Sequence, residues 1–146
     1  YKIIVITNQS GIARGLYTEL QFKKLNDWML NEFTKRSVLI DKVFFCPYHP
    51  DGKIKKYKLN SELRKPNIGM IKEAEKFHQI DFKRSLIIGD KETDIECGHN
   101  AGLRYGFLIN KNFNNIHFSN FKSNQKFNYY IFSNLEDLSK KIEKLN

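Results

Sequence analysis

The sequence predicts a single α/β domain with a mainly parallel sheet. Short apolar runs alternate with amphipathic segments along the 146 residues, which is the pattern of strand–helix–strand units. A composition of 40% hydrophobic and 14% aromatic residues is typical of a chain with a packed core. No apolar run approaches the ~20 residues of a membrane-spanning helix, and two cysteines give no disulfide framework. We therefore expect a cytoplasmic protein that does not contact a membrane.

Five apolar runs predict the strands of the sheet. They are residues 2–7, 43–46, 85–89, 104–110 and 129–132. The first run is rich in Ile and Val, as strands buried on both faces of a parallel sheet are. Residues 110–128 hold seven Asn and no acidic residue, and we expect an irregular surface excursion there.

Amphipathic segments between these runs predict the helices. Thr18 and Gln21 have the spacing of a capping box, residues 93–100 indicate a short helix closed by Gly102, and Asn134 can cap a last helix. The expected buried stripes are Phe22, Leu25, Met29 and Phe33 in the first helix, Met70, Ile71, Ala74 and Phe77 after Pro66, and Leu135, Leu138, Ile142 and Leu145 in the last.

The formal charge of +9 comes from 25 Lys and Arg against 16 Asp and Glu. Six of these cations crowd one short stretch, namely Lys53, Lys55, Lys56, Lys58, Arg64 and Lys65. Elsewhere the lysines alternate with acidic residues, as they do on ordinary solvated helices. A basic face could bind nucleic acid, but this distribution does not favour it, and we expect no nucleic-acid partner.

Ligands of parallel α/β sheets bind beyond the carboxyl ends of the strands. After the first predicted strand, the segment from Thr7 to Gly11 offers hydroxyl and amide groups that can donate to an anion; the alternative is an ordinary polar turn. Before Pro66, Arg64 offers a planar fork to phosphate and Lys65 a mobile charge; the alternative is a solvated basic loop.

After the third predicted strand come Asp90 and Asp94. A carboxylate at a strand end, followed by another four residues on, is a candidate Mg²⁺ site. The alternative for Asp94 is that it only favours the first turn of a helix through the helix dipole. Together, the three strand ends indicate Mg²⁺-assisted phosphoryl chemistry.

The same motifs resemble those of the haloacid dehalogenase-like phosphatases. The matching segments occur in the expected order: Thr7-Asn8-Gln9-Ser10-Gly11-Ile12-Ala13-Arg14-Gly15, Cys46-Pro47-Tyr48-His49-Pro50, Arg64-Lys65-Pro66 with Gly69-Met70, and Gly89-Asp90-Lys91 with Thr93-Asp94. The resemblance covers roughly residues 2–102. It implies a Rossmann-like three-layer sandwich with Mg²⁺ as the cofactor.

The resemblance also implies a role for each matching residue. Thr7 would bind the phosphoryl group, and Lys65 would steady the nucleophile and the transferring phosphate. Asp90 would bind Mg²⁺, and Asp94 would hold the acidic motif together by pairing with Lys65. The remaining substrate contacts would be Asn8, Gln9, Ser10, Arg64 for a second phosphate, and Lys91.

The family often holds a structural zinc in the loop after the second strand. Cys46 stands at the first ligand position, but Tyr48, Ser61 and Leu63 replace the other three ligands. One thiolate cannot supply a closed tetrahedral site, and we predict no zinc. The loop would instead be held by its prolines, Tyr48, Tyr57 and hydrogen bonds, with His49 as a loop or substrate contact.

The family's nucleophile lies in an Asp-x-Asp motif at the end of an earlier strand, and this sequence contains no Asp-x-Asp. The resemblance places that strand at the centre of the sheet, so this chain would lack its central N-terminal strand. We expect one domain over residues 1–146 that is incomplete at its N-terminus, because Tyr1 opens an apolar run. The alternative is a truncated homologue that has repaired its sheet. In either case we expect this chain alone to be inactive.

The activity implied by the resemblance is hydrolysis of a phosphate ester by way of an aspartyl-phosphate. The expected substrate is a small sugar bisphosphate, D-glycero-D-manno-heptose 1,7-bisphosphate, cleaved at its 7-phosphate. Histidinol phosphate is the alternative, but Arg64 and Lys65 favour a bisphosphate over a substrate that carries a cationic amine. A hypothesis of another class is a non-catalytic phosphate-binding module. We expect a monomer.

Overall fold

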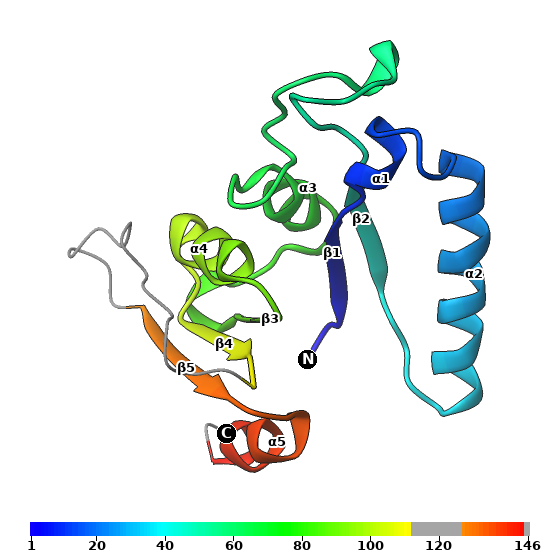
Figure 1. Ribbon diagram of the computed structural model, residues 1–146. Coiled ribbons are helices and arrows are strands. Elements are labelled where there is room, and N and C mark those ends of the chain that lie inside the picture. Colours follow the sequence, from blue (N-terminus) through cyan, green and yellow to red (C-terminus); the bar gives the residue numbers. More distant parts are fainter. Residues whose placement is uncertain (112–126, 145–146) are drawn as a thin grey trace. The chain divides into compact units, whose positions relative to one another are not determined.

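The computed structural model describes residues 1–111 and 127–144. The chain divides into two compact units, Tyr1–Gln79 and Ile80–Asn146, called here the N-terminal and the C-terminal unit (Figure 1). Each unit has its own parallel sheet with helices attached to it. The parallel strands and intervening helices confirm the predicted Rossmann-like α/β class.

The sheet of the N-terminal unit pairs β1 (Ile4–Asn8) with β2 (Lys42–Cys46). The two strands run parallel, with Ile4 opposite Lys42 and Asn8 opposite Cys46. The register therefore brings the residues that follow β1 and β2 to the same sheet edge. The backbone N–H of Gln9 continues this pairing by donating to the carbonyl of Cys46 at 2.8 Å.

Two helices connect β1 to β2. The first is the short α1 (Ser10–Ala13), in the segment for which a polar turn was the alternative interpretation. The second is α2 (Glu19–Lys35), whose predicted capping box between Thr18 and Gln21 is present. Ion pairs from Glu19 and Glu32 to basic residues three or four positions later add to its stability.

The buried stripe predicted for α2 is largely wrong. Phe22 is buried and packs on Phe45 with ring centroids 4.7 Å apart, and Met29 is half-buried, but Leu25 and Phe33 are 60% and 39% exposed. A 17-residue helix is about 25 Å long and a five-residue strand about 17 Å, so a two-stranded sheet leaves part of the helix uncovered.

The helix α3 (Gly69–His78) packs against both strands of the N-terminal unit. Met70, Ile71 and Ala74 are buried as predicted. Phe77 is 69% exposed, contrary to prediction. It lies in the last turn of α3, and the centroid of its ring is 6.0 Å from that of Phe44. A single 3₁₀ turn, η1 (Lys55–Tyr57), interrupts the loop between β2 and α3.

The C-terminal unit is a three-stranded parallel sheet in the order β3 (Leu86–Gly89), β4 (Tyr105–Ile109), β5 (Asn128–Phe132). The helix α4 (Glu92–Ala101) packs on β3 and β4, and α5 (Leu135–Glu143) follows β5. A 3₁₀ turn, η2 (Phe82–Arg84), precedes β3. The fully buried side chains of this core include Ile95, Phe107 and Leu108.

The predicted helix ends of this unit are confirmed. Gly102 closes α4 with a φ of +78°, a left-handed conformation that suits glycine. Asn134 caps α5 by accepting from the backbone N–H of Asp137. Leu138 is buried as predicted, but Leu135 is 66% exposed, because it is the first residue of the helix. Leu145 lies outside the described residues.

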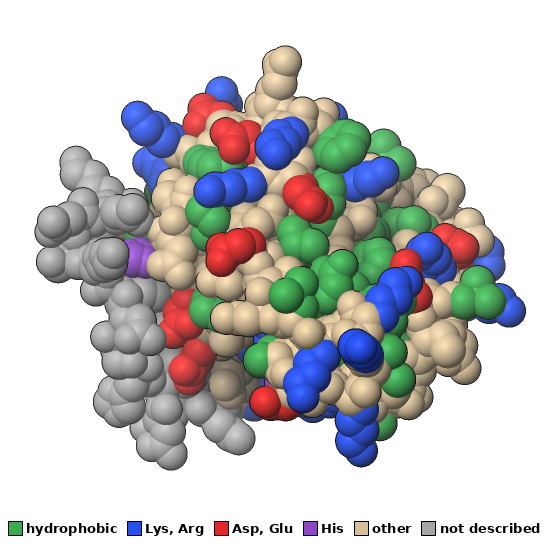
Figure 2. All heavy atoms as spheres, turned by 90° about the horizontal axis from the view of Figure 1, so that it is seen from above, with side chains coloured by type: hydrophobic (Ala, Val, Ile, Leu, Met, Phe, Trp, Pro, Cys, Tyr) green, Lys and Arg blue, Asp and Glu red, His purple; other side chains and the backbone are tan. Residues whose placement is uncertain are grey.

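The expected excursion over residues 110–128 falls mostly on residues 112–126, which lie outside the described part of the chain. Across the described residues, no helix is both long and apolar enough to cross a membrane. On the face drawn in Figure 2, Lys and Arg side chains alternate with acidic and hydrophobic ones rather than forming one block. The interpretation of the charge as ordinary surface lysines agrees with this view.

Candidate active site

The end of β1 carries the first group of candidate site residues. Gln9 is hydrogen bonded on both sides of its side chain: its Nε2 donates to Thr7 Oγ1 at 2.9 Å, and its Oε1 accepts from the Tyr17 hydroxyl at 2.6 Å. The structure therefore brings Thr7 and Gln9 together as the sequence predicted. It adds Tyr17, which the sequence pattern did not indicate.

Asn8 and Lys65 form the second group, although 57 positions separate them in the sequence. The Asn8 Oδ1 accepts from the backbone N–H of Lys65 at 3.1 Å, and its Nδ2 donates to the Lys65 carbonyl at 3.2 Å. The ammonium of Lys65 donates to the carbonyl of Ile6 at 2.8 Å. The cation thus lies against β1, at the carbonyl of the residue that precedes Thr7.

Arg64 stands next to Lys65 on the same loop. Its Nη1 is buried and has no hydrogen-bond partner in the described part of the chain. A buried guanidinium nitrogen without an acceptor is costly, unless a ligand supplies the acceptor. The position therefore fits a phosphate oxygen, which is the role predicted for Arg64.

The loop after β2 is held by ordinary contacts. The backbone N–H of His49 donates to the Tyr57 carbonyl at 3.1 Å, and Tyr48 and Tyr57 lie with ring centroids 6.1 Å apart. The Tyr57 hydroxyl donates to Glu19 Oε2 at 2.7 Å, which ties the loop to the start of α2. The predicted roles of Tyr48 and Tyr57 in holding this loop agree with these contacts.

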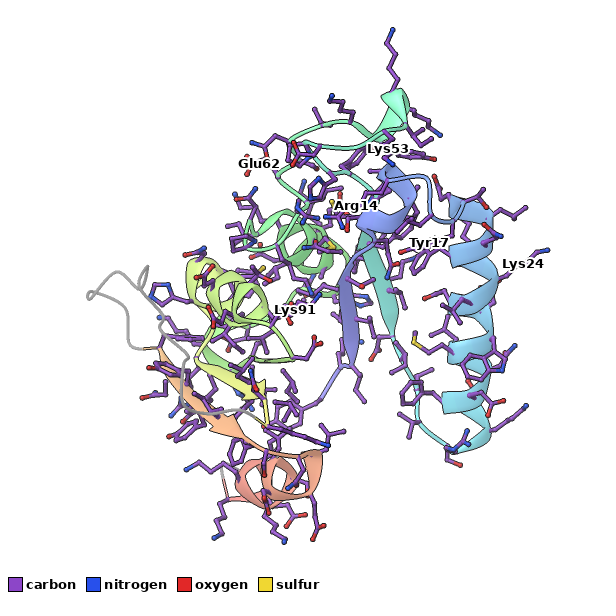
Figure 3. The ribbon with its side chains drawn as sticks, viewed as in Figure 1. Arg14, Tyr17, Lys24, Lys53, Glu62 and Lys91 are labelled. Carbon is purple, nitrogen blue, oxygen red and sulfur yellow. The ribbon has the colours of Figure 1, made fainter. Side chains whose placement is uncertain are left out.

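Arg14 and His49 meet beside this loop. The Nη2 of Arg14 lies 3.1 Å from the Nε2 of His49, and the His49 Nδ1 accepts from the backbone N–H of Asp51 at 3.1 Å. Arg14 is the residue that caps the C-terminal end of α1 (Figure 3). The sequence pattern did not single out Arg14 as a site residue, because a lone arginine after a short polar segment is no signal of a contact with His49.

The donor set at Cys46 does not fit zinc. The Cys46 thiol points at the Tyr48 carbonyl, with Sγ 3.9 Å from the oxygen, and Ser61 Oγ accepts from the backbone N–H of Leu63 at 3.2 Å. Burial raises the pKa of the Cys46 thiol, and the positive charge of Arg64 only partly offsets it. One cysteine thiol beside a serine hydroxyl does not supply the four Cys, His or carboxylate ligands of a structural zinc site.

Asp90 and Asp94 lie in the C-terminal unit. Asp94 is 5% exposed, and its Oδ2 accepts from the backbone N–H of Lys91 at 3.1 Å, at the start of α4. A Cβ on Gly89 would collide with the Asp94 carboxylate, so glycine permits this close approach. Asp90 is exposed immediately beyond β3, and Lys91 is exposed beside it.

A magnesium ion is commonly held by one or two carboxylates, with water completing six oxygen ligands. The exposed carboxylate of Asp90 fits one such ligand. The described residues contain no group of three His, Cys, Asp or Glu that could hold a metal ion. The residues present therefore fit part of a Mg²⁺ shell. The pairing of Asp94 with Lys65 stays a prediction, because the two residues belong to different units.

Comparisons with known proteins agree with these motifs. A family model described as HAD-hydrolase-like matches residues 62–114. D-glycero-alpha-D-manno-heptose-1,7-bisphosphate 7-phosphatases from Photorhabdus laumondii and Burkholderia mallei are 45% and 48% identical over 109 residues, which is 75% of this chain and 60% and 58% of theirs. The D-glycero-beta-D-manno-heptose-1,7-bisphosphate 7-phosphatase of Escherichia coli K12 is 40% identical over 109 residues, or 57% of its length.

Two solved structures resemble this one. A protein from Mesorhizobium loti assigned as a HAD-like phosphatase is 32% identical, with a TM-score of 0.81 over 97% of this chain and 64% of its own. The D,D-heptose 1,7-bisphosphate phosphatase from B. bronchiseptica, complexed with magnesium and phosphate, has a TM-score of 0.74 over 99% of this chain and 75% of its own. At 19% identity, the second likeness supports the fold alone.

The chain belongs to the haloacid dehalogenase-like family, as its parallel α/β fold and its ordered motifs predicted. Within that family, its sequence is similar to the heptose-1,7-bisphosphate 7-phosphatases named above. It spans 57% to 60% of the length of these curated relatives.

Proposed function

We propose that this chain forms part of a Mg²⁺-dependent phosphatase acting on the 7-phosphate of D-glycero-D-manno-heptose 1,7-bisphosphate. The observation that carries the proposal is the position of Lys65. Its ammonium is held 2.8 Å from the carbonyl of Ile6, the residue that precedes Thr7 in β1. The names of relatives at 40% to 48% identity support the substrate. The proposal places the protein in cytoplasmic carbohydrate metabolism, as a monomer.

Each candidate site residue then has a role in binding or charge stabilisation. Thr7 donates its hydroxyl hydrogen to a phosphoryl oxygen, with Gln9 and Ser10 beside it. Lys65 balances the charge that develops on the transferring phosphoryl group, which a preorganised cation does most effectively in a partly buried site. The buried Nη1 of Arg64 receives the second phosphate.

Asp90 holds the magnesium ion, Asp94 fixes the strand end beside it, and Lys91 reaches the substrate. When bound, Mg²⁺ neutralises charge on the phosphoryl oxygens. The attacking carboxylate belongs to an Asp-x-Asp motif that is absent from this sequence. The aspartyl-phosphate therefore forms on a residue outside these 146, and we expect this chain alone to turn over no substrate.

The test is phosphate release by the full-length gene product with Mg²⁺. The substrates are both anomers of heptose 1,7-bisphosphate, histidinol phosphate and fructose 1,6-bisphosphate. We expect release from a heptose bisphosphate at a kcat/KM at least about 100-fold above the other two, a discrimination of about 2.7 kcal/mol. A preference for histidinol phosphate would favour the alternative substrate. If no phosphate is released from any of these substrates, the hypothesis of a non-catalytic phosphate-binding module is favoured instead.

A further inference from the structure

A chain of two hydrogen bonds leads from Tyr17 to the Thr7 hydroxyl. The Tyr17 hydroxyl lies 2.6 Å from Gln9 Oε1, and Gln9 Nε2 lies 2.9 Å from Thr7 Oγ1. All three side chains are half-buried; Thr7 lies in β1, and Gln9 and Tyr17 belong to the segment that follows it. Figure 3 shows Tyr17 between this segment and α2.

The chemistry of the groups fixes the direction of each bond. An amide oxygen can only accept, so the Tyr17 hydroxyl must donate to Gln9 Oε1. The amide nitrogen of Gln9 can only donate, so Thr7 Oγ1 must accept from it. The hydroxyl hydrogen of Thr7 is then directed away from Gln9, and none of the described residues accepts it.

A close approach at Gly11 keeps Tyr17 in place. A Cβ on Gly11 would collide with the Cε1, Cζ and hydroxyl atoms of the Tyr17 ring. Gly11 is itself buried in α1. The missing side chain at position 11 therefore creates the space in which the Tyr17 ring lies and from which its hydroxyl reaches Gln9.

We propose that Tyr17 and Gln9 are positioning residues that orient the Thr7 hydroxyl as a hydrogen-bond donor to the bound phosphoryl group. This inference rests on the proposed function and deepens it. Without the Gln9 donor, the Thr7 hydroxyl could rotate and offer its lone pairs to the phosphate, which would repel it. With the donor in place, the phosphate meets a hydrogen already aimed at it, and no reorientation is needed on binding.

The test uses three variants of the full-length gene product: Tyr17→Phe, Gln9→Met and the double variant. Tyr17→Phe removes one hydroxyl and keeps the ring, and Gln9→Met removes the amide without adding charge. The affinity for inorganic phosphate with Mg²⁺ is measured by calorimetry, and kcat and KM are measured with heptose 1,7-bisphosphate. Tyr105→Phe, in the C-terminal unit, is the matched control.

We expect Gln9→Met to weaken phosphate binding about tenfold and Tyr17→Phe about threefold. The double variant should match Gln9→Met, because Tyr17 acts only through the Gln9 amide. A fourth variant, Gly11→Ala, displaces the ring while keeping all three polar groups, so it should lower phosphate affinity as Tyr17→Phe does. Tyr105→Phe should bind phosphate like the wild type.

Two results would overturn the inference while leaving the proposed function intact. One is unchanged phosphate affinity in both single variants, even with lowered melting temperatures. The other is a double variant whose loss is the product of the two single losses, since independent structural roles would multiply. A wild-type protein that neither binds phosphate nor hydrolyses any substrate would remove the proposed function, and this inference with it.

Discussion

The side chain of Asn8 and the backbone of Lys65 are joined by two reciprocal hydrogen bonds, 3.1 Å and 3.2 Å long. An amide side chain is suited to this, because it offers one acceptor and two donors in a fixed plane. Asn8 follows Thr7, and Lys65 is the proposed catalytic cation. The pair therefore connects the first sheet edge to the basic loop before α3, and we propose that Asn8 also lines the substrate.

Asn8→Ala should lower the free energy of unfolding by about 1–3 kcal/mol, because it leaves the N–H and C=O of Lys65 without their side-chain partner. It should also lower kcat, since the ammonium of Lys65 depends on the position of its backbone. Asn8→Asp keeps the acceptor for the Lys65 N–H but loses the donor to its carbonyl, so it should fall between Asn8→Ala and the wild type in stability. Denaturant titration and steady-state kinetics measure both effects.

The matched control for this prediction is Asn31→Ala, on the exposed face of α2. It should change the free energy of unfolding by less than about 0.5 kcal/mol. Equal losses from Asn8→Ala and Asn31→Ala would contradict the importance of the Asn8–Lys65 pair.

Arg64→Met should raise KM for a sugar bisphosphate much more than for the corresponding monophosphate. The buried Nη1 of Arg64 has no acceptor within residues 1–111 and 127–144, so the second phosphate is its expected partner. Loss of one charged hydrogen bond corresponds to an increase in KM of about 10-fold to 100-fold. Arg36→Met, at the end of α2, is the control, because Arg36 pairs with Glu32. An equal increase for both substrates would place Arg64 outside the second phosphate site.

Gly89→Ala should destabilise the protein by about 1–3 kcal/mol, because the new methyl group collides with the buried Asp94 carboxylate. It should also raise the Mg²⁺ concentration needed for half-maximal activity, since Asp90 is the next residue. Gly102→Ala is the control. Alanine at its φ of +78° costs about 1 kcal/mol in backbone strain, but no atom of the described residues beyond its chain neighbours lies within 4 Å of the added Cβ, so this variant shows the effect of strain without a collision. A Gly89→Ala protein with normal stability and normal Mg²⁺ dependence would refute the role of this close approach.

Among the described residues, the sequence predicted the five strands and four of the helices, because hydrophobic periodicity and capping residues are local signals. Thr18, Gly102 and Asn134 mark helix ends wherever the rest of the chain lies. Burial was harder to predict. Leu25 and Phe77 have the spacing of core residues. Whether they are buried depends on how far the neighbouring element extends, and the local sequence does not indicate this.

The positions of the candidate residues at the ends of β1 and β3 could also be predicted, since the apolar runs mark where each strand ends. The contacts among them could not. The Asn8–Lys65 pair joins positions 57 residues apart, and Tyr17 reaches Gln9 only because Gly11 leaves room for its ring. A glycine in the turn before a tyrosine was the available signal, but it says nothing about a hydrogen bond.

The Cys46 thiol should react slowly with a thiol reagent at neutral pH. Burial raises its pKa, so little thiolate is present, and the side chain is 0% exposed. Unfolding should bring the rate to that of an ordinary cysteine.

The same sample should contain no stoichiometric zinc by elemental analysis. Stoichiometric zinc, with loss of structure on chelation, would contradict our account of Tyr48, Ser61 and Leu63.

The bond between Tyr57 and Glu19 predicts a pH-dependent tether for the loop after β2. The Tyr57 hydroxyl and then the Lys23 ammonium lower the pKa of Glu19 from its usual 4.5 in the folded protein. Because the folded pKa lies below the unfolded one, the stabilisation is fully present above the unfolded pKa and is lost as pH falls through the folded pKa. Tyr57→Phe should move the pKa of Glu19 back toward 4.5 and reduce the loss of stability between pH 4.5 and lower pH. Carboxyl-selective NMR titration of Glu19 and denaturant titration at several pH values measure these effects. If the pKa of Glu19 in Tyr57→Phe equals its pKa in the wild type, the Tyr57 hydroxyl does not hold the carboxylate.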